Sequence, residues 1–292
     1  MHRQPNKKLI EMEKNTKLSY EVKTAVRQGV TRDLPHGPED LQWVSNSATL
    51  IYGEHDAVLV DTFTFISQNE DLVAWVKSFN RNLTHIYITH GHGDHWLGVG
   101  QLLKAFPNTI AVGTKETVAD APINDLPVYR ENFWEKLFPG QIPSSVYPTV
   151  LENTFIELEG HRLEVIDTGH TDTAHSTSLW VPSIGLVVAG DVVYNHTHPF
   201  TAETSAESRE HWAKAAEKLE ALNPVVVVSG HKQPQLSDAP ETIALTAKYL
   251  RDFNRIEAET TTALELYDRM LELYPRWANP GSLWGGAKVV KQ

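Results

Sequence analysis

The amino-acid sequence predicts an α/β fold in which two mixed sheets pack face to face with helices outside, as one four-layer domain over residues 1–292. Strand-like and helix-like segments alternate from about Leu18 onward, and they form two similar halves that each run from strands to helices. Elements of this kind bury their apolar faces by stacking in layers. The composition, 41% hydrophobic and 22% charged, is that of a globular protein and excludes disordered and fibrous classes.

The first half begins with two β-rich runs around a Gly-Glu-His-Asp turn, which predict a hairpin over residues 48–61. Residues 69–79 carry Leu72, Val76 and Phe79 at the spacing of one helical face. Further along the chain we expect a strand, a helix and a strand, at residues 85–89, 94–106 and 109–112.

The second half shows four strand-like runs, then a helix and a short apolar strand that is typical of burial on both faces. Thr204 and Glu207 are placed like a capping box before this helix. The predicted strands are residues 154–158, 162–167, 177–181, 185–189 and 225–228, and the predicted helix is residues 208–222.

Two segments stand apart from this pattern. Residues 121–148 interleave five prolines with aromatic residues, which predicts an inserted lid or, equally, a connection whose aromatic side chains fill the core or a dimer contact. Residues 240–292 form a helical carboxy-terminal extension, with a break expected around residues 257–262. Its Trp277 and Trp284, with Phe63, Phe65, Phe133, Trp134 and Phe138, are candidates for enclosing an apolar substrate.

Charge and residue usage narrow the function. The chain has 26 Lys and Arg against 37 Asp and Glu, a formal net charge of -11, which disfavours a nucleic-acid partner. No cysteine is present, so thiol nucleophiles, disulfides and iron–sulfur clusters are excluded. Residues 1–17 lack the apolar block of a secretory signal, and no apolar run is long enough to span a membrane. We therefore expect a cytoplasmic protein with a small-molecule substrate, and we leave a homodimer open.

The most informative segment reads Thr-His-Gly-His-Gly-Asp-His-Trp, just after the strand that ends near Ile88. It places His90, His92, Asp94 and His95 within six residues. Glycines between them let the backbone curl, so these side chains can point to a common volume. When several imidazoles and carboxylates lie this close together beside apolar strands, their burial is costly unless they are paired or bound to metal.

Here the sequence resembles the metallo-β-lactamase superfamily, whose H-x-H-x-D-H motif is matched by residues 90–95. Gly169-His170-Thr171, Gly190-Asp191 and Gly230-His231 follow in the family's order, each at a strand end. The resemblance implies the metallo-β-lactamase fold and a dinuclear metal site. One ion would be held by His90, His92 and His170, the second by Asp94, His95 and His231, with Asp191 as the bridge.

Nitrogen and oxygen donors in this mixture suit two Zn²⁺ ions, with Mn²⁺ or Fe²⁺ left open. Such a pair would lower the pKa of a shared water to about 7 and supply a hydroxide nucleophile. Asp94 could orient that nucleophile and accept its proton. Tyr194 is placed like a tyrosine of N-acyl-homoserine lactonases, where it would help hold the oxyanion; packing beneath the site is the alternative.

Several branches of the family do not fit. Nucleic-acid-processing members need a basic surface, flavodiiron members need a flavin domain, and secreted β-lactamases need a signal peptide. The expected function is therefore hydrolytic opening of a lactone or lactam, or cleavage of a related carboxylic ester. A glyoxalase-II-like thioesterase, a mononuclear-iron persulfide dioxygenase and a non-catalytic metal protein remain alternatives. His175, His196 and His198 are expected at the rim or surface.

Overall fold

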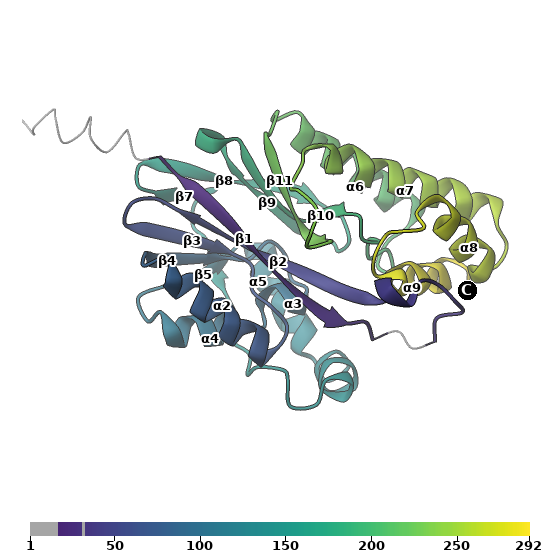
Figure 1. Ribbon diagram of the computed structural model, residues 1–292, viewed down its shortest axis with the longest axis horizontal. Coiled ribbons are helices and arrows are strands. Elements are labelled where there is room, and N and C mark those ends of the chain that lie inside the picture. Colours follow the sequence, from purple (N-terminus) through teal and green to yellow (C-terminus); the bar gives the residue numbers. More distant parts are fainter. Residues whose placement is uncertain (1–16, 31–32) are drawn as a thin grey trace, which may run out of the picture.

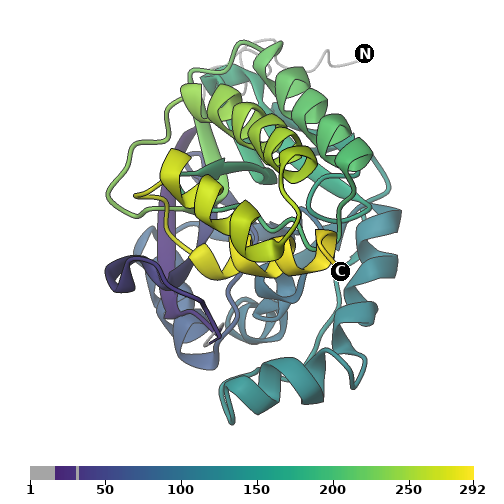
Figure 2. The same ribbon diagram turned by 90° about the vertical axis from the view of Figure 1, so that its right-hand side faces the viewer.

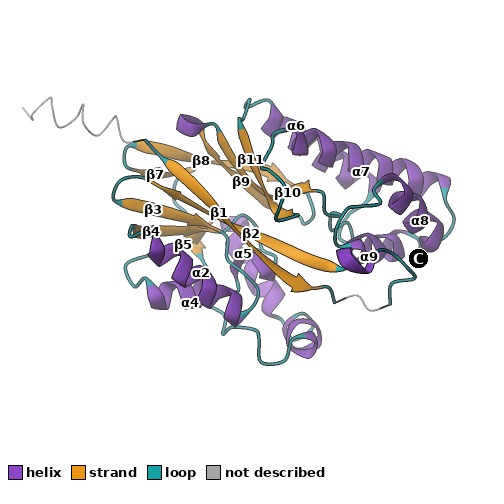
Figure 3. Cartoon of the chain, in the orientation of Figure 1, coloured by secondary structure: helices purple, strands orange, loops and turns teal. Residues whose placement is uncertain are grey.

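The structure, a computed structural model, describes residues 17–30 and 33–292. Residues 1–16, which carry most of the expectation about a secretory signal, lie outside the described residues. Strands gather into two sheets in the middle of the molecule and helices lie on both outer sides (Figures 1 and 3). The predicted α/β class and the four-layer arrangement are confirmed.

The first sheet has six strands in the order β1-β2-β3-β4-β5-β6. β1, β2 and β3 pair antiparallel, and the strands from β3 to β6 run parallel. Its strands are β1 (Ser19–Gln28), β2 (Trp43–Tyr52), β3 (Asp56–Val60), β4 (Asn82–Tyr87), β5 (Ile110–Gly113) and β6 (Thr149–Val150).

The second sheet has five strands in the order β11-β10-β9-β8-β7. Only β10 and β11 pair parallel within it. Its strands are β7 (Phe155–Leu158), β8 (His161–Gly169), β9 (Ser176–Val181), β10 (Leu186–Asn195) and β11 (Val226–Lys232), and η4 (Pro182–Ile184) connects β9 to β10.

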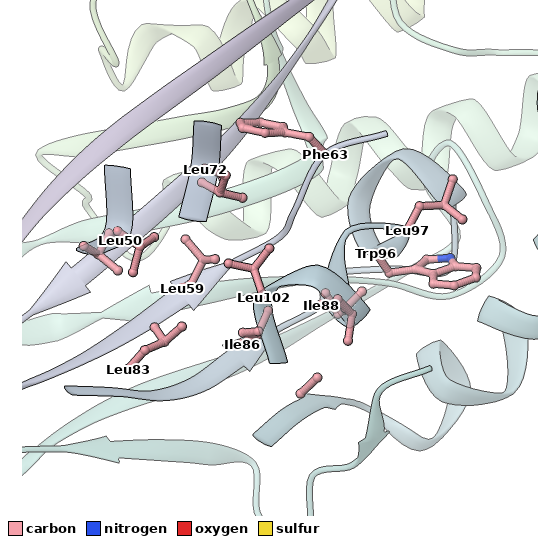
Figure 4. Packing of buried hydrophobic residues seen from close by; sticks show 14 of the residues in the cluster. Leu50, Leu59, Phe63, Leu72, Leu83, Ile86, Ile88, Trp96, Leu97 and Leu102 are labelled. Carbon is pink, nitrogen blue, oxygen red and sulfur yellow. The ribbon is translucent and has the colours of Figure 1, made fainter. Parts of the chain in front are cut away.

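Side-chain alternation along β3 separates two layers of the core. Leu59 packs with the helices α2 (Ile66–Ser78) and α4 (Val99–Ala105) on the outer face of the first sheet (Figure 4). Its neighbours Val58 and Val60 face the second sheet and contact the apolar side chains of β8 to β10. This period of two is what a strand buried on both faces requires.

The second sheet is covered on its outer face by α6 (Ala206–Glu220) and α7 (Glu241–Glu259). α7, α8 (Ala263–Leu273) and α9 (Pro280–Val290) then pack on one another through a separate apolar cluster. They belong to the carboxy-terminal extension, and its helical stretch breaks at residues 260–262, within the predicted range.

Residues 121–148 follow α5 (Lys115–Asp120) and contain η2 (Ala121–Asp125) and the π-helical η3 (Arg130–Glu135). Figure 2 shows this teal segment beside the stacked sheets and helices. Arg130 ties the segment together, because its guanidinium donates to Asp125, Glu135 and the carbonyl of Pro143 at 2.7–2.8 Å.

Three predicted details differ from the structure. The strands expected over residues 185–189 and 225–228 continue as β10 and β11 through Asp191 and His231. The helix expected over residues 94–106 is divided into α3 (Gly93–Trp96) and α4. The division lies beside Gly98, where any side chain would overlap Asn69 of α2. The cap of α6 is Ser205 with Ser208, one residue after the expected pair of Thr204 and Glu207, because the Ser205 hydroxyl accepts from the Ser208 backbone N–H. A short η1 (Glu39–Leu41) precedes β2.

Candidate metal centre

The potential ligands come from strand ends and loops at one edge of the two sheets. Residues 90–95 follow β4 and continue into α3, whereas Asp191 lies on β10 and His231 on β11. Gly91 allows the chain to pass α5 closely, since a Cβ there would lie 2.6 Å from that of Asp120. β2 and β11 are joined nearby, because the Lys232 N–H donates to the Ser45 hydroxyl at 3.1 Å.

A first group of ligand atoms is formed by His90, His92 and Asp172. Their ligand atoms lie within 4.8 Å of one another. Oδ2 of Asp172 is 3.5 Å from Nε2 of His90 and 2.8 Å from Nδ1 of His92. Two imidazoles and one carboxylate at these separations match the ligand set of a zinc site that keeps an open position.

A second group is formed by Asp94, His95 and His231, also within 4.8 Å. Asp191 lies between the two groups: its Oδ1 is 3.3 Å from Nε2 of His95, and its Oδ2 is 3.0 Å from Nε2 of His231. Asp191 also forms a third group with His90 and His95. One carboxylate therefore faces ligands of both groups, as a bridging ligand does.

Unpartnered buried atoms at the centre fit a bound cation. Nε2 of His90, Nε2 of His95, Oδ2 of Asp172 and Oδ1 of Asp191 are all buried without a hydrogen-bond partner. Buried polar atoms of native proteins are normally satisfied, and here the unsatisfied atoms face one another. The donor set and its geometry therefore fit divalent metal ions, with nitrogen and oxygen ligands of the kind that Zn²⁺ binds.

The ring of His95 is oriented by a carboxylate behind it. Nδ1 of His95 lies 2.9 Å from Oδ2 of Asp61, and Asp61 accepts two further hydrogen bonds from Thr89, from its backbone N–H at 2.9 Å and its hydroxyl at 2.8 Å. Thr89 also contacts Nδ1 of His90 at 3.0 Å. Such outer partners fix the tautomer of a ligating imidazole and raise its basicity.

Strand β2 supplies partners for the second group. Nδ2 of Asn46 donates to Oδ2 of Asp94 at 2.9 Å, and Nδ1 of His231 contacts the backbone carbonyl of Ser45. Nε2 of His231 is then directed at the site, 3.8 Å from Oδ2 of Asp94. Asn46 was not predicted from the sequence, because an asparagine inside a strand has no motif around it.

The electrostatic balance of the cluster favours ionised carboxylates. Burial disfavours the charge of Asp191, but His231 and His95 outweigh it and hold the pKa of Asp191 well below its usual range. Burial lowers the pKa of His90, which favours the neutral imidazole that binds metal. Where imidazoles and carboxylates share protons, a divalent cation can take the place of those protons.

Tyr194 lies against the bridging carboxylate. Its hydroxyl donates to Oδ2 of Asp191 at 2.6 Å, and its ring stacks on His231 with centroids 5.3 Å apart. Burial first, and then the charge of Asp191, raise the pKa of Tyr194 well above its usual value, so the phenol stays protonated. The hydroxyl is therefore engaged with a ligand rather than free to face a substrate.

His170 is not brought into either group. After Gly169, which adopts a φ of +68°, the chain turns so that Nε2 of His170 lies 3.3 Å from the Glu203 backbone carbonyl. Asp172 instead is fully buried, and its Oδ1 accepts from the hydroxyls of Thr171 at 2.8 Å and Ser176 at 3.3 Å. The position expected for His170 is thus occupied by Asp172. The sequence places both in one turn, and only the turn geometry decides which side chain points inward.

A cavity of about 440 Å³ opens above the cluster. His92, Asp94, Asp191 and His231 contribute to its floor, and its walls come from β1, the 121–148 segment, the loop before α6 and α9. Its apolar wall residues are Val30, Val44, Val128, Tyr129, Phe133, Trp134 and Phe200, and Arg27 supplies a cation. A mostly apolar cavity with a few convergent polar groups is typical of a small-molecule site.

Several aromatic side chains proposed for this cavity lie elsewhere. Phe63 is fully buried in the core of the first sheet, Phe65 and Phe138 pack against that core, and Trp277 stacks on Tyr249. Trp284 packs on the cluster of α7, α8 and α9.

The histidines expected at the rim or surface have different positions. His175 is exposed, with its Nδ1 2.8 Å from Asp120, and His196 is half-buried. The expectation was wrong for His198, which is fully buried with Nδ1 2.9 Å from the Tyr249 hydroxyl.

Comparisons with known proteins agree with this architecture. The family model described as metallo-beta-lactamase superfamily matches residues 41–231. The metallo-beta-lactamase type 2 of Bacteroides fragilis is 24% identical over 191 residues, covering 64% of this chain and 69% of that protein. A UPF0173 metal-dependent hydrolase of Sulfolobus acidocaldarius is 28% identical over 151 residues, covering 52% of this chain and 56% of that protein.

The solved structure of a metallo-beta-lactamase family protein from Thermus thermophilus has a TM-score of 0.62 at 19% identity, and the match covers 92% of this chain and 91% of that one. At this identity the likeness shows the fold. The family model spans more than half of the sequence and includes residues 90–95, Asp172, Asp191 and His231. The chain therefore belongs to the metallo-beta-lactamase superfamily and is a metal-dependent hydrolase.

Proposed function

We propose that this hydrolase opens a lactone or lactam, or cleaves a related carboxylic ester, with a dinuclear zinc centre. The observation that carries the proposal is the position of Asp191 at the floor of an apolar cavity, where it faces His90 of the first group and His95 and His231 of the second. A pair of metal ions held by these residues would supply hydroxide at neutral pH and polarise the substrate carbonyl.

The chain's own residues position the reaction. Asn46 donates to Oδ2 of Asp94, the oxygen 3.8 Å from Nε2 of His231, and so orients this carboxylate at the cavity floor, where it would accept a proton. Tyr194 fixes the orientation of Asp191 through its hydroxyl. Phe133, Trp134 and the valines of the wall exclude water from the acyl chain, which strengthens every electrostatic interaction at the floor.

The test combines elemental analysis of the purified protein with turnover of a lactone, a lactam, a carboxylic ester and S-lactoylglutathione. We expect about two zinc ions per chain and turnover of the lactone or ester that stops on chelation and returns with Zn²⁺. His92→Ala should lose bound metal and turnover together. Preference for S-lactoylglutathione would replace the proposal with a thioesterase, and one iron per chain with persulfide-dependent oxygen consumption would replace it with a dioxygenase.

A further inference from the structure

Arg27 lies in the wall of the cavity and has no hydrogen-bonded ion pair among the described residues; the carboxylate whose charge acts on it is Asp94, a candidate metal ligand. It belongs to β1 and pairs in register with Val44, another wall residue. Its Nε and Nη1 atoms are buried and make no hydrogen bond. Within residues 17–30 and 33–292, no carboxylate forms an ion pair with it.

Two aromatic rings hold the guanidinium. Its central carbon lies 5.5 Å from the ring centroid of Trp134 and 5.6 Å from that of Phe138. Cation–π contacts of this kind fix the position of an arginine but do not satisfy its hydrogen-bond donors. The 121–148 segment therefore holds Arg27 in place while its Nε and Nη1 atoms make no hydrogen bond.

Two other partly or fully buried arginines of the chain each form an ion pair with a carboxylate. Arg130 bonds Asp125 and Glu135, and Arg209 bonds Glu257 and Asn254. An arginine keeps its charge even when buried, and a buried charge without a partner is costly. Asp94 is the acidic group that acts on Arg27, and a bound metal ion would neutralise it, so an anion that enters the cavity from outside would give Arg27 a partner.

The other charges of the cavity limit what this anion can be. Asp94, Asp191 and Glu203 also line the cavity. A bound metal ion would neutralise Asp94 and Asp191, and Glu203, whose Oε1 lies 3.5 Å from Nε2 of His92, would remain as an acidic group of the cavity. A cavity with one arginine and one remaining carboxylate suits a singly charged group better than a dianion, and the planar guanidinium matches a carboxylate.

We infer that Arg27 forms a subsite for a carboxylate carried by the substrate, at the end of an apolar chain remote from the acyl group that reacts. This inference rests on the proposed function and narrows its substrate to a carboxylate-bearing ester or lactone. Arg27 lies before residue 41, outside the segment that the family model matches.

The experiment uses the zinc-loaded full chain and a matched ester pair, 4-nitrophenyl hydrogen adipate and 4-nitrophenyl hexanoate. Hydrolysis of either adds one water and releases 4-nitrophenol and the carboxylic acid. Wild type should favour the adipate ester in kcat/KM by roughly tenfold to a hundredfold, since a charge-assisted hydrogen bond is at stake. Arg27→Gln should lose this preference, because its KM for the adipate ester should rise more than its KM for the hexanoate ester.

Two further variants control for folding and for general charge. Arg162, which lies over the Phe155 ring on the exposed part of β8, gives the matched variant Arg162→Gln, which should keep the preference. Arg27→Lys, which keeps the charge without the planar group, should keep part of it. Thermal unfolding and zinc content, measured on each variant, identify any variant that is misfolded.

Calorimetry separates failure of the subsite from failure of the proposed function. Adipate and hexanoate are titrated into zinc-loaded wild type and Arg27→Gln. Tighter binding of adipate by wild type alone supports the subsite even where neither ester is hydrolysed. Equal binding of the two acids by wild type, or the same preference in Arg27→Gln and Arg27→Lys as in wild type, overturns it while leaving the hydrolase proposal untouched.

Discussion

The hydroxyl of Tyr194 donates a 2.6 Å hydrogen bond to Oδ2 of Asp191, the carboxylate that faces both ligand groups. A phenol in this position restrains a ligand, whereas a tyrosine that holds an oxyanion needs its hydroxyl free. The geometry thus indicates that Tyr194 positions Asp191 rather than donating to an oxyanion. One substitution can distinguish these two roles.

Tyr194→Phe should lower metal affinity by roughly tenfold to a hundredfold, as losses of outer partners do. Zinc affinity is measured by competition with a chromogenic chelator. A variant with unchanged zinc affinity but lower kcat would return Tyr194 to the role of oxyanion donor.

Asp172→Ala should lower zinc affinity by more than the roughly hundredfold reached by losses of outer partners, because Asp172 contributes a ligand atom. His170→Ala, two residues away in the same turn, is the matched control and should keep its zinc within about twofold. Elemental analysis after dialysis against a weak chelator measures the zinc that each variant retains. The reverse result would restore His170 as the ligand.

Gly285→Leu should narrow the cavity without disturbing the fold. Gly285 lines the cavity, and a Cβ built there meets no atom within 4 Å. We expect KM for a long acyl ester to rise roughly tenfold while a short ester is unaffected, as volume changes in apolar pockets do. Gly286→Ala should instead lower the melting temperature, because its Cβ would overlap Thr201. Unchanged selectivity in Gly285→Leu would mean that substrates do not reach α9.

Protonation of Glu159 should make the free energy of unfolding fall at acid pH. Burial opposes its ionisation, but backbone N–H groups of Asp56, His55 and Glu54, which donate at 2.7–2.9 Å, lower its pKa. Because its pKa is lower in the folded chain than in the unfolded chain, Glu159 stabilises the fold at pH values above its unfolded pKa of about 4.3. This contribution disappears as the pH falls through the folded pKa.

Urea unfolding between pH 3 and 7 measures this contribution in wild type and Glu159→Gln. We expect the wild type to be more stable at pH 7 by about 1 kcal/mol, allowing for solvent screening, and the difference to shrink as the pH falls below about 4.3. A difference that is constant with pH would assign the effect to packing.

The sequence predicted most readily what is local. Four potential ligands within residues 90–95 are close in space whatever the tertiary structure, and Asp191 and His231 follow apolar runs that are easily recognised in the sequence. The choice between His170 and Asp172 depends instead on a φ of +68° at Gly169, which the residue type permits but does not require.

Arg27 could not be predicted for a different reason. It lies on an edge strand whose sequence alternates without any motif, and its environment is made by Trp134 and Phe138, more than a hundred positions away in the chain. The helix α9 was likewise missed as a separate element, since Gly281, Gly285 and Gly286 lower its helix propensity and packing on α7 and α8 stabilises it.

Part of the cavity wall comes from outside the stretch of the polypeptide that contains the cavity floor. The floor residues His92, Asp94, Asp191 and His231 all fall within residues 41–231, whereas Arg27 and Gly285 lie outside that range. Substitutions in β1 or α9 can therefore alter which molecules are accepted and leave the reactive centre intact. Substrate selectivity can thus change during evolution through substitutions in β1 and α9, while the metal centre and its reaction stay the same.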